Sequence, residues 1–357
     1  MELSEGGPIR ASAFRNPYRG WLAELLLFVP QNDSGGSIVH LAPEMSDAEA
    51  SAWPIVAEWT STPKAIVSTM YKGLVQVYWA DHEGLVWRTL LMPEGFTAAE
   101  KLSWAGRTNM LKAAYYLPPG ARSAEPVVYG AARRGGSRAT ELWIHTAESP
   151  PAVFALPAPL CWANDFHVSM TGPDSWVVDL GEGGLLQRWE GRTGGKLVRL
   201  LAYTMTGIKA ECVFGVCGRP ETRFPAPQFL AQDGIAYLWS PSRGPIPCTA
   251  AGRGIIQAFS VVTSAEESLV YLVSQEGRLT VTRQLMCGGH DPLWGSSTVL
   301  LPHSDSAAYS MVVLTHPSEH PAVFAIDQGS VTLWTPVSRE YGIGRTLSPW
   351  TSARIWV

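Results

Sequence analysis

A short unit recurs seven times along this chain and limits its fold more than any other feature. Each copy is an apolar segment with a bulky residue, a turn that contains glycine, and a second apolar segment. The copies follow one another roughly every 50 residues, a period typical of proteins built from repeated structural units. The bulky positions are Phe28, Tyr78, Tyr129, Val178, Tyr237, Tyr271 and Phe324.

A column of small residues has the same period and precedes the bulky positions. Its members are Ser12, Ser68, Ala113, Ser169, Pro227, Ser260 and Ser310. In a ring of β-sheets the innermost strands crowd around the axis, where only small side chains fit. The two columns predict an all-β fold, a β-propeller of seven blades with four antiparallel strands each. Six blades are the alternative, because Tyr237 and Tyr271 lie closer together than the other copies.

The alternation of apolar residues places the strands of the clearest copies. In the second copy it predicts strands at 64–71, 74–81, 84–91 and 100–106, and in the last copy at 310–316, 322–327, 330–336 and 352–357. Residues 1–357 are expected to form one propeller domain. A stretch rich in Gly, Pro and Cys breaks the period at about 203–224 and is predicted to be an insert on one face of the ring.

Composition excludes several classes of function. The formal charge of −4 argues against a nucleic-acid partner, since phosphate-binding surfaces carry excess Lys and Arg. No apolar run reaches the roughly 20 residues that cross a bilayer. The five cysteines, an odd number, suit reduced thiols, and the start of the chain does not resemble a secretory signal. We expect a soluble, cytoplasmic protein, secreted only if a signal peptide had been removed.

No motif for a metal, phosphate or covalent nucleophile is present. Cys212 and Cys217 lack the further ligands that a structural zinc site requires. Neither a metal nor an organic cofactor is therefore expected. The remaining candidate is the funnel at the hub, where side chains from many blades converge.

The funnel residues are predicted by following each inner strand outward from its small residue. The candidate catalytic residues are Arg10, His167 and Arg223, which could polarise a substrate oxygen. The candidate substrate-binding residues are Phe14, Lys64, Met70, Tyr115, Asp165, Phe229 and Gln257. His167 shares a face with Ser169 by strand alternation and is expected to exchange a proton near neutral pH. The alternative is that the polar groups only solvate the mouth of a channel.

The second copy, VYWAD followed by a turn and GLVWRTL, resembles the repeat of fungal fucose-specific and related bacterial propeller lectins. Lectins of this type repeat their sugar-contacting residues in every blade. Here Trp87-Arg88 recurs only as the reversed Arg188-Trp189, which indicates a single ligand site. Degenerate propellers of this kind are similar to fungal hetero-Diels–Alderases of natural product biosynthesis.

Two function classes follow, together with a third that is general for propellers. The leading hypothesis is a cofactor-independent cyclase, similar to a hetero-Diels–Alderase, that holds a hydrophobic small molecule in the central funnel. The alternative is a lectin-like module that binds glycans between blades, around Trp87-Arg88 and Arg188-Trp189. A platform for protein interaction is the third possibility.

Overall fold

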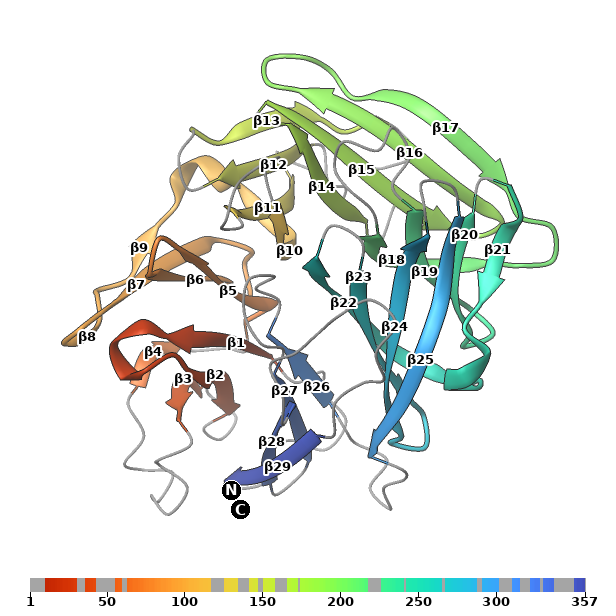
Figure 1. The fold of residues 1–357 in the computed structure, drawn as a ribbon. Helices are drawn as coiled ribbons and strands as arrows, with labels where there is room; N and C mark the ends of the chain where they lie inside the picture. Colours follow the sequence, from red (N-terminus) through yellow and green to blue (C-terminus); the bar gives the residue numbers. More distant parts are fainter. Residues whose placement is uncertain are drawn as a thin grey trace.

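Seven antiparallel sheets stand around a common centre, which confirms the predicted seven-bladed β-propeller with four-stranded blades (Figure 1). The computed structural model describes residues 10–30, 36–42, 55–59, 63–116, 125–133, 141–146, 150–157, 166–172, 174–217, 226–240, 242–264, 267–287, 291–301, 310–314, 322–327, 330–336 and 350–356. Within these ranges every blade consists of strands that are consecutive in the chain.

In each of the first four blades, the strands run outward from the hub in chain order. Blade one comprises β1 (Ala11–Asn16), β2 (Leu22–Pro30), β3 (Gly36–Leu41) and β4 (Ile55–Trp59). Blade two comprises β5 (Ala65–Tyr71), β6 (Leu74–Ala80), β7 (Val86–Met92), β8 (Gly95–Phe96) and β9 (Glu100–Lys101), the last two both paired with β7. Blade three comprises β10 (Arg107–Tyr116), β11 (Glu125–Arg133), β12 (Glu141–Thr146) and β13 (Ala152–Ala155). Blade four comprises β14 (His167–Gly172), β15 (Ser175–Glu182), β16 (Leu185–Arg192) and β17 (Val198–Thr204).

The last three blades follow the same order. Blade five comprises β18 (Ala210–Cys217), β19 (Ala226–Ala231), β20 (Ala236–Ser240) and β21 (Gly244–Pro247). Blade six comprises β22 (Ile255–Ser264), β23 (Glu267–Ser274), β24 (Leu279–Cys287) and β25 (Asp291–Leu301). Blade seven comprises β26 (Ser310–Val313), β27 (Val323–Asp327), β28 (Ser330–Pro336) and β29 (Trp350–Trp356). The described residues include three short 3₁₀ helices, η1 (Pro17–Arg19), η5 (Ser103–Ala105) and η6 (Thr249–Ala251).

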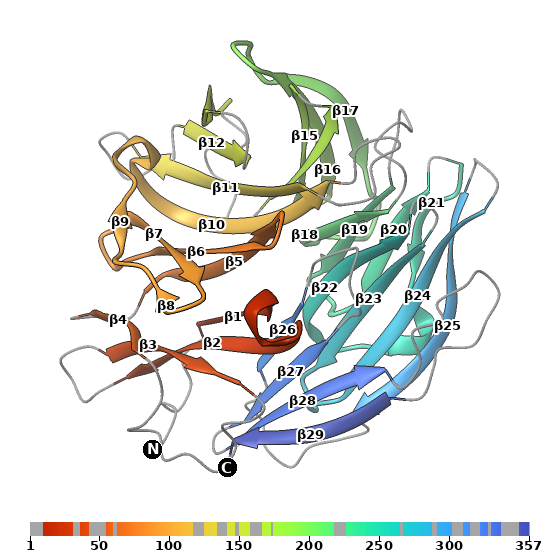
Figure 2. The ribbon, with the colours of Figure 1, turned by 60° about the vertical axis from the view of Figure 1, so that its left-hand side comes forward.

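The hydrophobic core is divided among the interfaces between neighbouring blades. Each of the seven interfaces in the ring contains its own cluster of buried apolar side chains, including the interface between blades seven and one. Figure 2 shows the first blade beside the last, and β1 contacts β26 at the hub. The apolar cluster between blades seven and one therefore closes the ring by side-chain packing. Burial of each large apolar side chain in such a cluster contributes roughly 1.5–3 kcal/mol to stability. Among the described residues, no helix has the length and apolar character needed to cross a lipid bilayer.

The predicted bulky column is confirmed in five blades. Phe28, Tyr78, Tyr129, Tyr271 and Phe324 lie on the second strand of their blades, and each is buried against the next blade. A wide side chain at this place fills the wedge that opens between two diverging sheets.

Blades four and five depart from the predicted columns. Val178 packs backward against blade three, and Tyr237 lies on the third strand, β20. Pro227 lies on the second strand, whereas Gly215 of β18 takes the small position at the hub. A side chain at Gly215 would overlap that of Ser260. Glycine therefore fits the crowded hub position at which a small residue is predicted.

The fifth blade is complete, which makes the six-bladed alternative wrong. The strand β18 lies within the predicted insert of residues 203–224 and forms the innermost strand of this blade. The segment 218–225 lies outside the described residues. Tyr237 lies on the third strand of its blade and Tyr271 on the second strand of the next, which explains their close spacing.

Candidate functional site

The innermost strands of all seven blades, β1, β5, β10, β14, β18, β22 and β26, surround a central cavity of about 510 Å³. Five members of the predicted small column line it: Ser12, Ser68, Ala113, Ser169 and Ser260. Short side chains at these places leave the hub open. The volume falls within the range of sites that bind small organic molecules.

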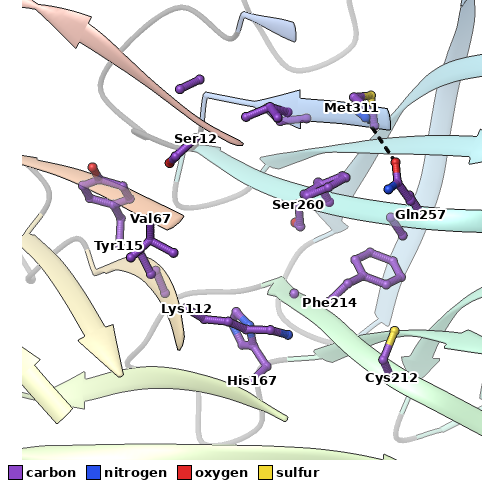
Figure 3. Close-up of a pocket in the computed structure, with 18 of the residues that line it drawn as sticks. Ser12, Val67, Lys112, Tyr115, His167, Cys212, Phe214, Gln257, Ser260 and Met311 are labelled. Carbon is purple, nitrogen blue, oxygen red and sulfur yellow. Dashed lines mark hydrogen bonds between the residues drawn. The ribbon is translucent and has the colours of Figure 1, made fainter. Parts of the chain in front are cut away.

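Lys112 and His167 lie side by side in the wall of this cavity (Figure 3). Burial, together with the nearby cations Lys112 and Arg188, lowers the pKa of His167 to about 3. The imidazole is therefore neutral at pH 7, which corrects the expectation that it exchanges a proton near neutrality. It can still donate or accept one hydrogen bond at each ring nitrogen.

Two further predicted residues line the cavity. The hydroxyl of Tyr115 accepts a hydrogen bond from the backbone N–H of Met70 at 2.9 Å. The side-chain oxygen of Gln257 accepts one from the backbone N–H of Met311 at 3.2 Å. Both bonds join the inner strands of neighbouring blades and hold these side chains in place.

The structure does not bring the other predicted residues to the cavity. Phe14 and Met70 are buried between blades one and two, and Phe229 stacks on Tyr237 between blades four and five. Arg10 and Lys64 precede β1 and β5 and do not line the cavity.

Two predicted residues, Asp165 and Arg223, lie outside the described residues. Cys212 lines the cavity, whereas the side chain of Cys217 lies outside the described part of the chain. Within the described ranges, no three His, Cys, Asp or Glu side chains are grouped as a metal site requires.

A second group of polar and aromatic side chains lies between blades two and three, and we call it the Arg88 cluster: Tyr78, Arg88, Glu100, Trp104 and His145. Arg88 on β7 is directly opposite Tyr78 on β6, whose ring packs toward blade three. The Nη2 of Arg88 donates a hydrogen bond to the Glu100 carboxylate at 2.7 Å. The side chains of this pair are 26% and 61% exposed, so solvent reaches both.

Trp104 and His145 complete the cluster from the side of blade three. Their ring centroids lie 5.2 Å apart, and the hydroxyl of Tyr78 lies 3.5 Å from Nδ1 of His145. Burial and the charge of Arg88 lower the pKa of His145, which keeps this imidazole neutral beside a cation. The result is an exposed ion pair next to a partly exposed indole ring.

The corresponding arginine of blade four has a different environment. Arg188 on β16 is directly opposite Asp179 on β15, and its Nε and Nη2 donate to the two carboxylate oxygens at 2.7 and 3.0 Å. The Arg188 side chain is 4% exposed and that of Asp179 1%. We call this group the Arg188 pair. The neighbouring Trp87 and Trp189 point to the opposite faces of their sheets and pack against the preceding blades.

No family model matches the chain, and no curated protein matches it in sequence. Among solved structures it is similar to BBS1N, crystallised in complex with ARL6DN, with a TM-score of 0.50 and 10% identity over 90% of this chain and 88% of that one. It is also similar to Aleuria aurantia lectin in complex with alpha-methyl-L-fucoside, with a TM-score of 0.47 and 10% identity over 85% of this chain and 98% of the lectin. For SapL1 lectin in complex with alpha methyl fucoside the TM-score is 0.42, with 11% identity over 96% and 97%.

These likenesses concern the fold. The protein is a seven-bladed propeller. It has a central cavity at the hub and, between blades two and three, the solvent-accessible Arg88 cluster.

Sequence reasoning missed Lys112, Glu100, Trp104 and His145. Lys112 precedes Ala113 of the small column, and a charged residue inside a predicted inner strand was the available signal. Glu100 and Trp104 belong to a short outer strand and a 3₁₀ helix, whose positions depend on the packing of blade three.

Proposed function

We propose that this protein binds carbohydrate and that the Arg88 cluster is the binding site. The observation that carries the proposal is the exposed Arg88–Glu100 pair beside the rings of Trp104 and His145. This places a hydrogen-bond donor, an acceptor and an apolar ring surface next to one another.

Each of these groups matches one feature of a sugar. The guanidinium donates to a hydroxyl oxygen and the carboxylate accepts from a hydroxyl, and charged partners strengthen both bonds. The indole ring of Trp104 presents an apolar surface against which the C–H face of a pyranose can pack. Neutral His145 adds hydrogen-bonding capacity without repelling Arg88.

Binding at one interface fits the differences between blades. The Arg188 pair, at the corresponding interface of blade four, is buried and fully engaged with itself. An arginine that already has both carboxylate oxygens as partners offers little to a ligand. We therefore expect one dominant sugar site among the described blades, with the weak affinity of a single shallow contact.

The test is a binding measurement on a panel of methyl glycosides of neutral hexoses and 6-deoxyhexoses, by ligand-observed NMR and calorimetry. Arg88→Met and Trp104→Ala are each expected to weaken binding by about tenfold or more. Arg192→Met, at an exposed arginine of blade four, is the matched control and retains binding. Circular dichroism verifies that each variant is folded. The absence of binding by the unmodified protein across the panel, or equal affinity of all three variants, contradicts the proposal.

A second candidate function is the predicted cofactor-independent cyclase, which the central cavity favours because Tyr115, His167 and Gln257 line it. Such a reaction requires a shaped site and a hydrogen bond to a developing oxyanion, and neutral His167 could supply that bond. The test is incubation with linear dienes that carry an activated carbonyl group, followed by chiral chromatography. Stereoselective cyclisation that His167→Ala removes supports this candidate. Racemic product formed at the rate of the buffer control contradicts it.

A further inference from the structure

The strand β17 forms the outer edge of blade four. It pairs with β16 on one side and has no described strand on the other, and Figures 1 and 2 both show it on the rim of the ring. Its seven residues include no proline, which would remove a backbone N–H. Several other outer strands are protected: β13 and β21 have four residues each, and β21 and β25 contain proline. An unprotected edge is a template on which a further strand can pair.

Backbone groups of β17 point toward this open edge. Directly hydrogen-bonded pairs alternate with unbonded pairs along an antiparallel ladder. The N–H of Met205 donates to the carbonyl of Gly184 at 2.7 Å, so the next bonded pair along β17 is that of Tyr203. The N–H and C=O groups of Ala202 and Thr204 therefore face away from β16 and toward the edge.

This half of β17 is held in a regular conformation. Tyr203 packs on Trp239 of blade five, with ring centroids 4.3 Å apart. A bulge at Leu200, which pairs with no residue of β16, lies in the first half of the strand, and residues 201–204 pair with β16 without interruption. The edge is therefore formed before a partner strand arrives.

Apolar and basic side chains accompany the open backbone. Val198 and Leu200 are 60% and 44% exposed. Arg199 lies between them in the strand, and Lys196 lies in the turn before it. Both cations are exposed, and neither forms an ion pair with a described residue. The chain as a whole carries a formal charge of −4, so this edge is a basic surface on an acidic protein.

The charge of the edge favours one kind of partner. The strand β17 contains no acidic residue, so pairing with a second copy of β17 would bring no negative charge to Arg199. The neighbouring Arg192 is 77% exposed and pairs with Glu190 at 3.8 Å, which adds a third cation close to the strand. Complementary charge therefore requires a strand that carries acidic side chains.

We propose that the outer edge of blade four binds an extended acidic segment of a partner protein, which adds a fifth strand beside β17. The backbone groups of Ala202 and Thr204 supply affinity, and Arg199 and Lys196 select acidic side chains. This edge lies apart from the Arg88 cluster and from the central cavity. The inference holds or fails independently of sugar recognition and of catalysis.

The experiment titrates the full chain into a fluorescein-labelled heptapeptide, Asp-Val-Glu-Leu-Glu-Val-Asp, and follows fluorescence anisotropy. Two matched peptides are compared: one has lysine at the four acidic positions, and the other has every internal backbone nitrogen methylated, which prevents strand pairing. The unmodified protein is expected to bind the acidic peptide at least about tenfold more tightly than either of them.

Variants of β17 test the backbone and the charge separately. Ala202→Pro removes an N–H that faces away from β16 and is expected to weaken binding of the acidic peptide by about tenfold or more. Ala202→Ser keeps this N–H and is the matched control, with unchanged affinity. The double variant Lys196→Glu, Arg199→Glu is expected to lose the preference for the acidic peptide over the lysine peptide. Circular dichroism verifies folding, and the methylated peptide tests strand pairing without any change in the protein.

Four results would overturn the proposal. They are failure to bind the acidic peptide, equal affinity for the acidic and lysine peptides, equal affinity for the acidic and methylated peptides, and equal affinity of Ala202→Pro and Ala202→Ser. Sedimentation velocity tests the other occupant, since the unmodified protein is expected to be a monomer. A dimer that Ala202→Pro dissociates would assign the edge to a second copy of the chain and likewise overturn the proposal.

Discussion

Arg88 and Arg188 occupy matching places in their blades, and the difference between them lies in the residue on the neighbouring strand. Both lie on the third strand and face the next blade. Opposite Arg88 is Tyr78, and the acid that pairs with the arginine comes from the exposed outer edge, as Glu100. Opposite Arg188 is Asp179, which engages the guanidinium within the sheet. One repeated position thus holds a solvent-accessible ion pair in one blade and a buried ion pair in another.

Burial determines how firmly each of these two arginines is held by its carboxylate partner. A buried ion pair is costly to break because removal of one partner leaves an unpaired charge. A half-exposed pair contributes little to stability, since water and salt compete for both groups. We therefore expect the contacts of the Arg88 cluster to break at small cost and those of the Arg188 pair at a large cost.

The largest expected effect is on stability at the Arg188 pair. Asp179→Ala leaves the Arg188 guanidinium buried and unpaired, and we expect a loss of about 3–5 kcal/mol in the free energy of unfolding. Chemical denaturation measures this. Glu100→Ala, the matched change at the Arg88 cluster, is expected to cost less than about 1 kcal/mol. Similar losses in both variants would show that the two arginines are equivalent in the folded protein.

His167, near the Arg188 pair, is expected to make the stability of the folded protein fall in acid. The folded pKa of His167, about 3, lies below the unfolded value of 6.5, so the unfolded chain binds more protons between these pH values. The contribution of His167 to the free energy of unfolding is fully present above pH 6.5. It falls by about 1.4 kcal/mol per pH unit between pH 6.5 and pH 3. Unfolding midpoints at pH 7.5, 6 and 5 are expected to decline less steeply in His167→Gln than in the unmodified protein. His82→Gln, at an exposed turn, is the matched control, and parallel profiles for His167→Gln and the unmodified protein contradict a buried neutral imidazole.

A smaller effect is expected from the charge of the Arg88 cluster. Glu100→Gln keeps a hydrogen-bonding side chain but removes the carboxylate, which weakens the bonds to Arg88 and to a sugar hydroxyl. Sugar affinity is expected to fall by about three- to tenfold, with little change in the free energy of unfolding. Calorimetry with the best methyl glycoside measures the sugar affinity, and chemical denaturation measures the free energy of unfolding. Unchanged affinity would exclude Glu100 from the site.

The smallest effect is expected when both members of the Arg188 pair are replaced. Apolar residues of similar size often substitute for a buried ion pair at little cost. The double variant Asp179→Leu, Arg188→Met is expected to unfold within about 1 kcal/mol of the unmodified protein, in contrast to Asp179→Ala alone. A denaturation curve decides this. If the double variant is as unstable as Asp179→Ala, the ion pair stabilises the fold by more than the mutual cancellation of two buried charges.

Sequence predicted the fold well because each blade repeats the same packing problem. Small residues at the hub and wide residues such as Tyr129 and Tyr271 between sheets recur wherever the geometry recurs. The prediction was wrong in blade five, where Gly215 takes the small position within a segment whose composition is typical of loops.

The candidate site was harder to predict because it depends on side-chain direction. Trp87 and Arg88 are adjacent in sequence, but strand alternation sends them to opposite faces, so only Arg88 joins the cluster. Phe14 and Phe229 lie on strands near the hub yet point between blades. Tyr115 and His167 each lie two residues from a member of the small column, and so does Phe14, so alternation alone did not distinguish the side chains that reach the cavity.

The most direct test is a crystal structure of the protein soaked with the methyl glycoside that binds best. We expect one sugar in contact with Arg88, Glu100 and Trp104, and no sugar at Arg188. Sugars bound equally at several blade interfaces, or at Arg188, would show that burial of the arginine does not separate a ligand site from a structural ion pair.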